Sequence, residues 1–221
     1  MSDLHPLSKE KCEQDSGPEK TIWHQMSIVP LSPGFRAVKG DILQLTAHGE
    51  NKLLIHGCNC FRTMSAGLAP QIKERYPAVY EADLRTEHGG YGKLGTISTA
   101  VVKNSEGHHL IIVNAYIQYH YGRRHQTAPH LPTDLQYPAT DSNRPGHADL
   151  EAIRRCFRLV AERFPDKEIY YPQIGAGLAG GPWSTIHEII DRELAERRRV
   201  LVIYQRSKSG ARSAGSKKKT P

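Results

Sequence analysis

A glycine-rich stretch at residues 171–183, YPQIGAGLAGGPW, constrains the fold more than any other part of the chain. It follows an apolar run and precedes a helical pattern. Small residues let a ligand approach the backbone closely, and they let successive amide groups turn the same way, which forms a nest for an anion. Pro182 suits the first turn of the next helix, whose N-terminus adds a partial positive charge. We therefore expect a phosphate-binding loop between a strand and a helix.

The same stretch matches the pattern G-x-G-x-x-G through Gly175, Gly177 and Gly180. A dinucleotide-binding βαβ unit also needs a following strand that ends in an acidic residue about 20 residues on. The next apolar run, at residues 200–204, ends instead in Gln205-Arg206, and a Ser/Lys/Gly-rich tail follows. The pattern therefore argues against a dehydrogenase and favours phosphate binding in another fold.

The chain of 221 residues has the length of one domain with flanking tails. We expect a disordered N-terminal arm at 1–34, a folded domain at 35–205 and a disordered basic tail at 206–221. The tail holds six of the Lys and Arg residues and no acid, while the net charge of the whole chain is +7. Such a tail either makes weak contact with nucleic acid or only keeps the terminus soluble.

The four cysteines have no disulfide-framework spacing, and neither a signal peptide nor a membrane-length apolar run is present. These features predict a soluble protein in a reducing intracellular setting, without membrane contact, located in the cytoplasm, the nucleus or both. We also expect a monomer. Cys58 and Cys60 beside His56 raise the possibility of zinc, but no second Cys/His pair has ligand spacing. We therefore expect neither a metal nor a cofactor.

Strands and helices alternate along the second half of the chain, with a hairpin in the middle. The patterns predict strands at residues 35–38, 52–56, 95–102, 109–115, 168–171 and 200–204, and helices at 70–85, 149–164 and 183–196. The first helix contains Tyr76-Pro77, where it can break. This order predicts a mixed sheet covered by helices on both faces. The irregular segment 117–146, rich in Tyr, His and Arg, is either a lid or substrate wall at the site or a surface insertion.

A second loop, at residues 56–69, repeats the design of the first: a strand end, small residues, and then Pro70 at a helix start. Two such turns at one edge of a sheet can face each other across a ligand. Asn59 offers both donors and an acceptor, which suits a sugar hydroxyl. Asp41, after the first strand, is either a cap or an acceptor for an exocyclic amino group.

These segments together resemble the macrodomain family. The matching motifs are VKGDI at 38–42, HGCNC at 56–60, SAGLA at 65–69 and PQIGAGLAGGPW at 172–183. They look most like the branch that contains yeast and phage-type ADP-ribose 1''-phosphate phosphatases. The resemblance covers about residues 35–205, without the insertion. It implies an α/β fold, a three-layer α/β/α sandwich with a mixed, mostly parallel central sheet.

The resemblance also implies a binding site for ADP-ribose or ADP-ribose 1''-phosphate, free or attached to protein. Asp41 would pair with the adenine amino group, with Gly40, Ile42 and Tyr204 beside it, although Tyr204 is equally an ordinary tyrosine at the edge of the core. Gly57, Cys58 and Asn59 would reach the distal ribose. The residues that would line the two walls of the phosphate channel are Met64, Ser65, Ala66, Gly67, Leu68 and Ala69, and Ile174, Gly175, Ala176, Gly177, Leu178, Ala179 and Gly180.

His56 and Asn59 are the catalytic candidates that the resemblance implies, while a lone His at a buried strand end is also a common structural residue. Branches that cleave ADP-ribose from glutamate carry an Asp where this chain has Ala179, and a Lys where its strand ends in residues 114–116. The implied function is therefore hydrolysis of ADP-ribose 1''-phosphate to ADP-ribose and phosphate. The alternatives are a non-catalytic ADP-ribose reader or a mono-ADP-ribosyl hydrolase.

Overall fold

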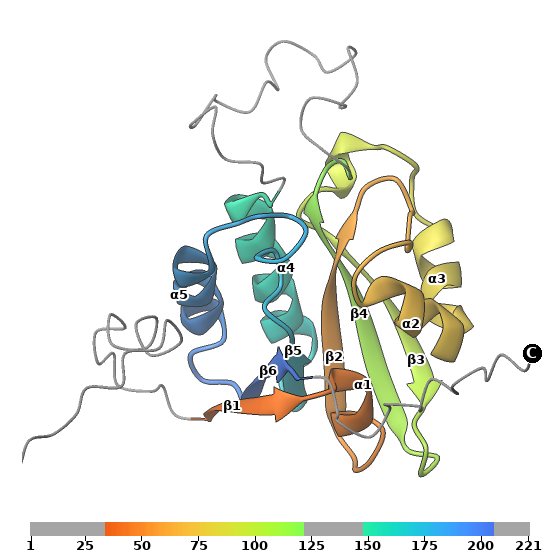
Figure 1. The fold of residues 1–221 in the computed structure, drawn as a ribbon, viewed down its shortest axis with the longest axis vertical. Coiled ribbons are helices and arrows are strands. Elements are labelled where there is room, and N and C mark those ends of the chain that lie inside the picture. The colour runs from red at the N-terminus through yellow and green to blue at the C-terminus, as the bar shows by residue number, and fades with distance from the viewer. Residues whose placement is uncertain (1–33, 122–147, 206–221) are drawn as a thin grey trace, which may run out of the picture. The chain divides into compact units, whose positions relative to one another are not determined.

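The computed structural model describes residues 34–121 and 148–205. The expectations for the N-terminal arm, the basic tail and most of the 117–146 insertion thus lie outside the described residues. The strands are β1 Phe35–Gly40, β2 Lys52–Asn59, β3 Ile97–Lys103, β4 His109–Gln118, β5 Glu168–Tyr171 and β6 Arg199–Tyr204. The helices are α1 Ile42–Leu45, α2 Ala69–Arg75, α3 Pro77–Leu84, the 3-10 turn η1 Tyr91–Lys93, α4 Leu150–Arg163 and α5 Trp183–Glu193. Figure 1 shows their arrangement.

The described strands form one six-stranded sheet in the order β1-β6-β5-β2-β4-β3. Every neighbouring pair is parallel except β3 with β4, which form the expected hairpin. The sheet is therefore mixed and mostly parallel, as predicted.

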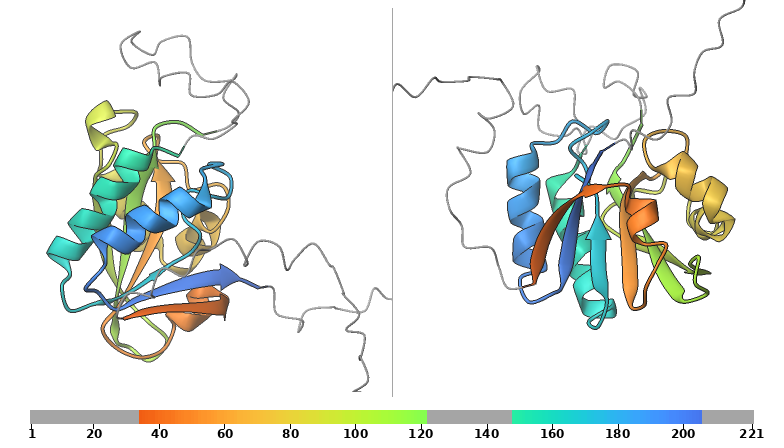
Figure 2. Two further views of the ribbon diagram at one scale, coloured as in Figure 1. Left: turned by 90° about the vertical axis from the view of Figure 1, so that its left-hand side faces the viewer. Right: turned by 60° about the horizontal axis from the view of Figure 1, so that its bottom comes forward.

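Helices cover both faces of the sheet (Figures 1 and 2). Leu53 and Ile55 of β2 point into a core shared with α4 and α5, whereas Leu54 points into a second core under α1, α2 and α3. This alternation follows from the two-residue period of a strand, and its apolar residues on both faces mark a fully covered strand. The three-layer α/β/α sandwich is thus confirmed.

Local sequence signals explain several element ends. The carboxylate of Asp149 caps α4 by accepting a hydrogen bond from the Ala152 amide (2.7 Å), and the helix buries Ile153, Phe157 and Val160. The helical pattern at 70–85 does break before Pro77, into α2 and α3. The break occurs because the proline ring disfavours helical geometry at the residue before it.

Several boundaries differ from the prediction. β2 continues to Asn59 instead of ending at His56, because Gly57, Cys58 and Asn59 still pair with β4. β4 likewise runs to Gln118, so the insertion cannot begin at Ile117, which is buried in the core. β1 is two residues longer than expected, β3 starts two residues later and α5 ends three residues earlier. The four-residue helix α1, which Asp41 caps, was not predicted.

Candidate functional site

The parallel strands β1, β6, β5, β2 and β4 all end at the same edge of the sheet, because parallel strands share a direction. The connections after β2 and β5 leave this edge toward opposite faces of the sheet, since α2 and α5 belong to different cores. This is the topological switch point at which open α/β sheets bind ligands. We call residues 60–69 loop 1, residues 172–182 loop 2, and the two together the two-loop site.

Loop 2 has a backbone that only glycine can adopt at some positions. Gly175 has φ +77°, and its carbonyl accepts a hydrogen bond from the Gly181 amide (2.8 Å). A Cβ on Gly181 would lie 2.7 Å from Cδ1 of Ile186, the side chain that α5 packs against the loop. Tight packing of the glycines against α4 and α5 therefore fixes the loop.

Three consecutive amides of loop 2 have no hydrogen-bond acceptor among the described residues. In the segments that the structure describes, the amides of Gly177, Leu178 and Ala179 donate to no other group. Pro182 is the N-cap of α5 rather than its first residue, and no side chain caps the helix. Loop 2 thus offers unpartnered donors beside a helix N-terminus, which together favour an anion.

Loop 1 also exposes main-chain amides. Ser65, Ala66 and Gly67 are exposed, and their amides have no partner among the described residues, whereas Met64 and Ala69 are buried and anchor the loop. The two loops approach each other, because a Cβ on Gly67 would lie only 3.7 Å from Cδ1 of Leu178. The structure therefore brings the two predicted loops together.

The backbone at Gly57, near the end of β2 and just before loop 1, is accessible. β5 pairs with β2 only as far as Leu54, so the later residues of β2 have no strand on that side, and Gly57 is exposed although it lies within a strand. A Cβ on Gly57 would lie 2.6 Å from Cδ1 of Ile117 and 3.2 Å from Cγ1 of Ile174. Glycine is needed here because two core side chains pack against its backbone.

The side chain of Asn59 stabilises loop 1 through hydrogen bonds. Its amide nitrogen donates to the Thr63 hydroxyl (2.6 Å), and its oxygen accepts from the Phe61 amide (2.8 Å). Its neighbour Cys58 is buried, and burial raises the pKa of the thiol well above its usual range. Both side chains are therefore buried and make their contacts within the protein.

The catalytic candidate His56 is a buried residue. It is only 2% exposed and lies on the α3 side of the sheet, where its Nε2 donates to Oδ1 of Asn114 (2.7 Å). The Asn114 amide in turn donates to the Val79 carbonyl of α3 (3.0 Å). Burial lowers the pKa of His56 to about 4, so the ring is neutral at pH 7. The burial and hydrogen bonding of His56 support a structural role for this residue.

A buried charge pair supports the end of β2, and no local pattern in the sequence indicates it. The Lys93 ammonium lies 3.1 Å from the Asp83 carboxylate, with the two side chains 3% and 1% exposed. The Tyr116 hydroxyl also donates to this carboxylate (2.9 Å), and Lys93 donates to the Cys60 carbonyl at the start of loop 1 (3.4 Å). This network ties loop 1 to α3 and η1.

The far end of the edge holds the predicted adenine residues. Asp41 caps α1 by accepting from the Leu43 amide (2.8 Å) through Oδ1, as the alternative from sequence anticipated. Ile42 is buried and Tyr204 is 69% exposed. Gly40 lies beside Tyr204, because β1 and β6 pair at these residues.

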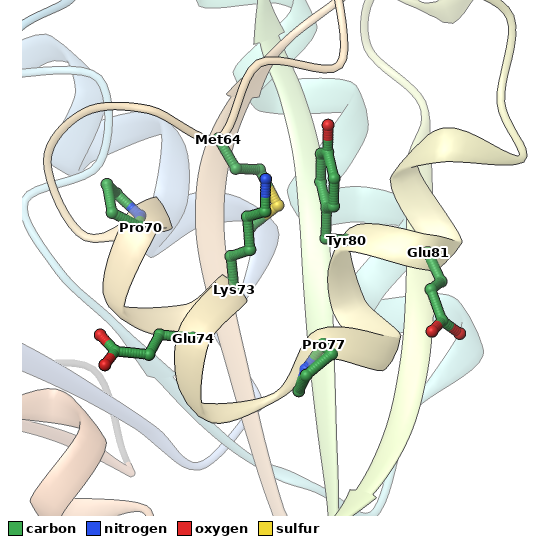
Figure 3. Close-up of a pocket in the computed structure, with 7 residues that line it drawn as sticks. All are labelled: Met64, Pro70, Lys73, Glu74, Pro77, Tyr80 and Glu81. Atoms are coloured by element: carbon green, nitrogen blue, oxygen red, sulfur yellow. The ribbon is translucent and has the colours of Figure 1, made fainter.

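A groove of about 520 Å³ lies elsewhere, between α2 and α3 (Figure 3). Its lining residues are Met64, Pro70, Lys73, Glu74, Pro77, Tyr80 and Glu81. The Lys73 ammonium lies 3.7 Å from the centre of the Tyr80 ring, and two carboxylates line the groove. It shares only Met64 with loop 1 and contains none of the unpartnered loop amides. It is therefore separate from the anion-binding candidate.

Within residues 34–121 and 148–205, no three His, Cys, Asp or Glu side chains are grouped so that they could hold a metal ion. No helix in these ranges is both long enough and apolar enough to cross a membrane.

Comparisons with known proteins agree with this architecture. No protein-family model matches the chain. The macrodomain protein from Streptomyces coelicolor has a TM-score of 0.51 at 18% identity, covering 78% of this chain and 99% of that one. Thermosipho africanus DarTG in complex with ADP-ribose has a TM-score of 0.54 at 18% identity, covering 81% of this chain and 44% of that one. At these identities the similarity establishes the fold: this is an α/β protein of the macrodomain type.

A sequence relative identifies the family more closely. The "uncharacterized 17.5 kDa protein in tk-vs intergenic region" of Enterobacteria phage T4 is 32% identical over 173 residues. The match covers 76% of this chain and 95% of the phage protein. The chain therefore belongs to the same family as this phage protein.

Proposed function

We propose that the protein binds ADP-ribose in the two-loop site and hydrolyses ADP-ribose 1''-phosphate to ADP-ribose and phosphate. The observation that carries the proposal is the set of unpartnered amides on Ser65–Gly67 and Gly177–Ala179, which two loops present at the switch point of the sheet. A diphosphate supplies acceptors for both sets. The ADP-ribose held by the structurally similar Thermosipho protein supports this choice of ligand.

The rest of the ligand follows the edge of the sheet in both directions. On the β6 side, the second carboxylate oxygen of Asp41 is free to accept the adenine amino group, and the exposed ring of Tyr204 lies nearby for stacking. On the β2 side, the distal ribose lies over the exposed backbone of Gly57. Because the Asn59 and Cys58 side chains are occupied, we expect main-chain contacts to dominate here.

The hydrolysis step would depend on positioning. The loop amides hold the phosphoryl oxygens and stabilise their charge while water attacks the phosphorus, and such stabilisation is the main component of catalysis in phosphoryl transfer. The burial of His56 argues against acid–base assistance from its imidazole. Without that acid–base assistance, we expect turnover to be slower by about two to four orders of magnitude than in an assisted enzyme.

The burial of His56 also favours a second candidate, an ADP-ribose reader that catalyses nothing. Calorimetry with ADP-ribose and measurement of phosphate released from ADP-ribose 1''-phosphate separate the cases. Binding with phosphate release supports the enzyme, and binding without release supports the reader. Absence of binding by folded protein at high micromolar ADP-ribose contradicts both.

A matched variant makes the test specific. His56→Gln should change stability without preferentially reducing turnover, because the ring is buried and hydrogen-bonded to Asn114. A loss of turnover at unchanged stability and unchanged ADP-ribose affinity would restore His56 as a catalytic group.

A further inference from the structure

A cluster of aromatic rings lies at the β4 end of the sheet edge, beside loop 1. We call it the aromatic platform, and its members are Phe61, His88, Tyr91, Tyr119, His120 and Tyr121. The Phe61 ring lies at the centre, with centroid distances of 4.7 Å to His120 and 5.2 Å to Tyr119. Tyr91 and Tyr119 stack at 3.9 Å, and His120 and Tyr121 stack at 4.8 Å with an interplanar angle of 13°.

The inner part of the platform is held firmly. The Tyr119 hydroxyl donates to the Gly89 carbonyl (2.8 Å), and the Tyr119 carbonyl accepts from the Cys60 amide (3.0 Å). Its outer part is open, because Tyr121 is 45% exposed. Rings in fixed orientation that end in an exposed tyrosine form a surface on which another planar ring can stack.

The platform adjoins the part of the site nearest the distal ribose. Phe61 is two residues beyond Asn59, which accepts its amide hydrogen bond, and Gly57 precedes both in β2. Three of the five exposed large hydrophobic side chains among the described residues lie at this edge: Tyr204, Leu178 and Tyr121. Along the strand order the edge therefore presents an exposed tyrosine, loop 2, loop 1 and a second exposed tyrosine.

We propose that the platform binds a second planar ring, attached to the distal ribose, so that the site accepts a whole dinucleotide such as NAD⁺. This inference rests on the proposed binding of ADP-ribose in the two-loop site. NAD⁺ carries a cationic pyridinium ring on the same carbon of the distal ribose that carries the phosphate in ADP-ribose 1''-phosphate. A cationic ring is attracted to the face of a tyrosine by electrostatics as well as by stacking. NAD⁺ would then compete with the phosphorylated substrate.

The test compares ligands and variants by calorimetry on the full-length chain. Tyr121→Ala should weaken NAD⁺ binding about five- to hundredfold, the range expected for removing one stacking partner. The same variant should leave ADP-ribose affinity within about twofold, because ADP-ribose has no ring at this end. Tyr121→Phe should retain NAD⁺ binding. NADH, whose reduced ring is neutral, should bind more weakly than NAD⁺ and depend less on Tyr121.

Two controls identify which proposal fails. Tyr204→Ala should weaken both ligands to a similar extent, and Val101→Ala, at an exposed position on β3, should change neither. If ADP-ribose binds but Tyr121→Ala fails to weaken NAD⁺ selectively, or NAD⁺ does not bind, the platform inference is wrong and the two-loop site stands. If folded protein binds neither ligand, the proposed function itself is wrong.

Discussion

Gly177 offers the most direct test of the anion site. A Cβ on this residue would meet nothing within 4 Å, and its φ lies outside the left-handed region. A side chain at this position therefore extends into open space beside the unpartnered amides of loop 2, without straining the backbone. Gly177→Glu should leave the free energy of unfolding within about 0.5 kcal/mol of wild type.

The effect on binding can be worked out from charge. A glutamate carboxylate about 4 Å from a phosphate oxygen costs about 1 kcal/mol in water and about 4 kcal/mol at the effective dielectric of a protein surface. ADP-ribose affinity should therefore fall by about five- to several-hundredfold. Gly177→Gln adds a side chain of the same size without charge and should lose less. The difference between the two variants should shrink as salt is added.

Calorimetry with ADP-ribose, alongside urea unfolding, measures both effects. Gly92→Glu is the matched control, because Gly92 also has open space around its Cβ, has no positive φ and lies in η1. It introduces the same charge outside loop 2. If folded Gly177→Glu protein bound ADP-ribose like wild type, the assignment of the diphosphate to loop 2 would be refuted.

Three further predictions concern stability, each measured by urea unfolding. Gly57→Ala should cost about 1–3 kcal/mol, because its methyl would lie 2.6 Å from Cδ1 of Ile117; Ile117→Val, which removes that atom, should recover part of the loss. Asp83→Asn should cost about 3–5 kcal/mol by leaving the buried Lys93 ammonium unpaired, and adding Lys93→Met should restore much of it; equal losses in both variants would argue against the pair. The folded-state pKa of His56, about 4, lies below its unfolded value, so this residue should remove about 3 kcal/mol of stability as the pH falls from about 6.5 to 4; His56→Gln should lack that loss.

The sequence predicted those parts of the fold that depend on local pattern. Ile153, Phe157 and Val160 recur at helical spacing, and the helix they predict is α4; the broken helix followed from Pro77 alone. Helix α1 was missed because four residues are too few to establish a period, although Asp41 carried its cap signal.

The site was only partly predictable for a different reason. The two glycine-containing loops could be predicted from the sequence, because their binding groups are backbone amides and runs of small residues indicate an accessible backbone. The burial of His56 depends on Val79 and Asn114, which are distant in sequence, and the pairing of Lys93 with Asp83 depends on how α3 and η1 pack. Nothing local to these side chains tells whether they face solvent or the core.

The close approach of Gly67 and Leu178 has a kinetic consequence. The tips of the two loops lie side by side, so a diphosphate held by the amides of both loops leaves most readily when the tips separate. Its residence time would then be set by how often the tips separate. Leu178→Ala should increase the dissociation rate of the ligand more than it weakens equilibrium affinity. The main-chain contacts to the ligand are the same in the variant, whereas the tips separate more easily.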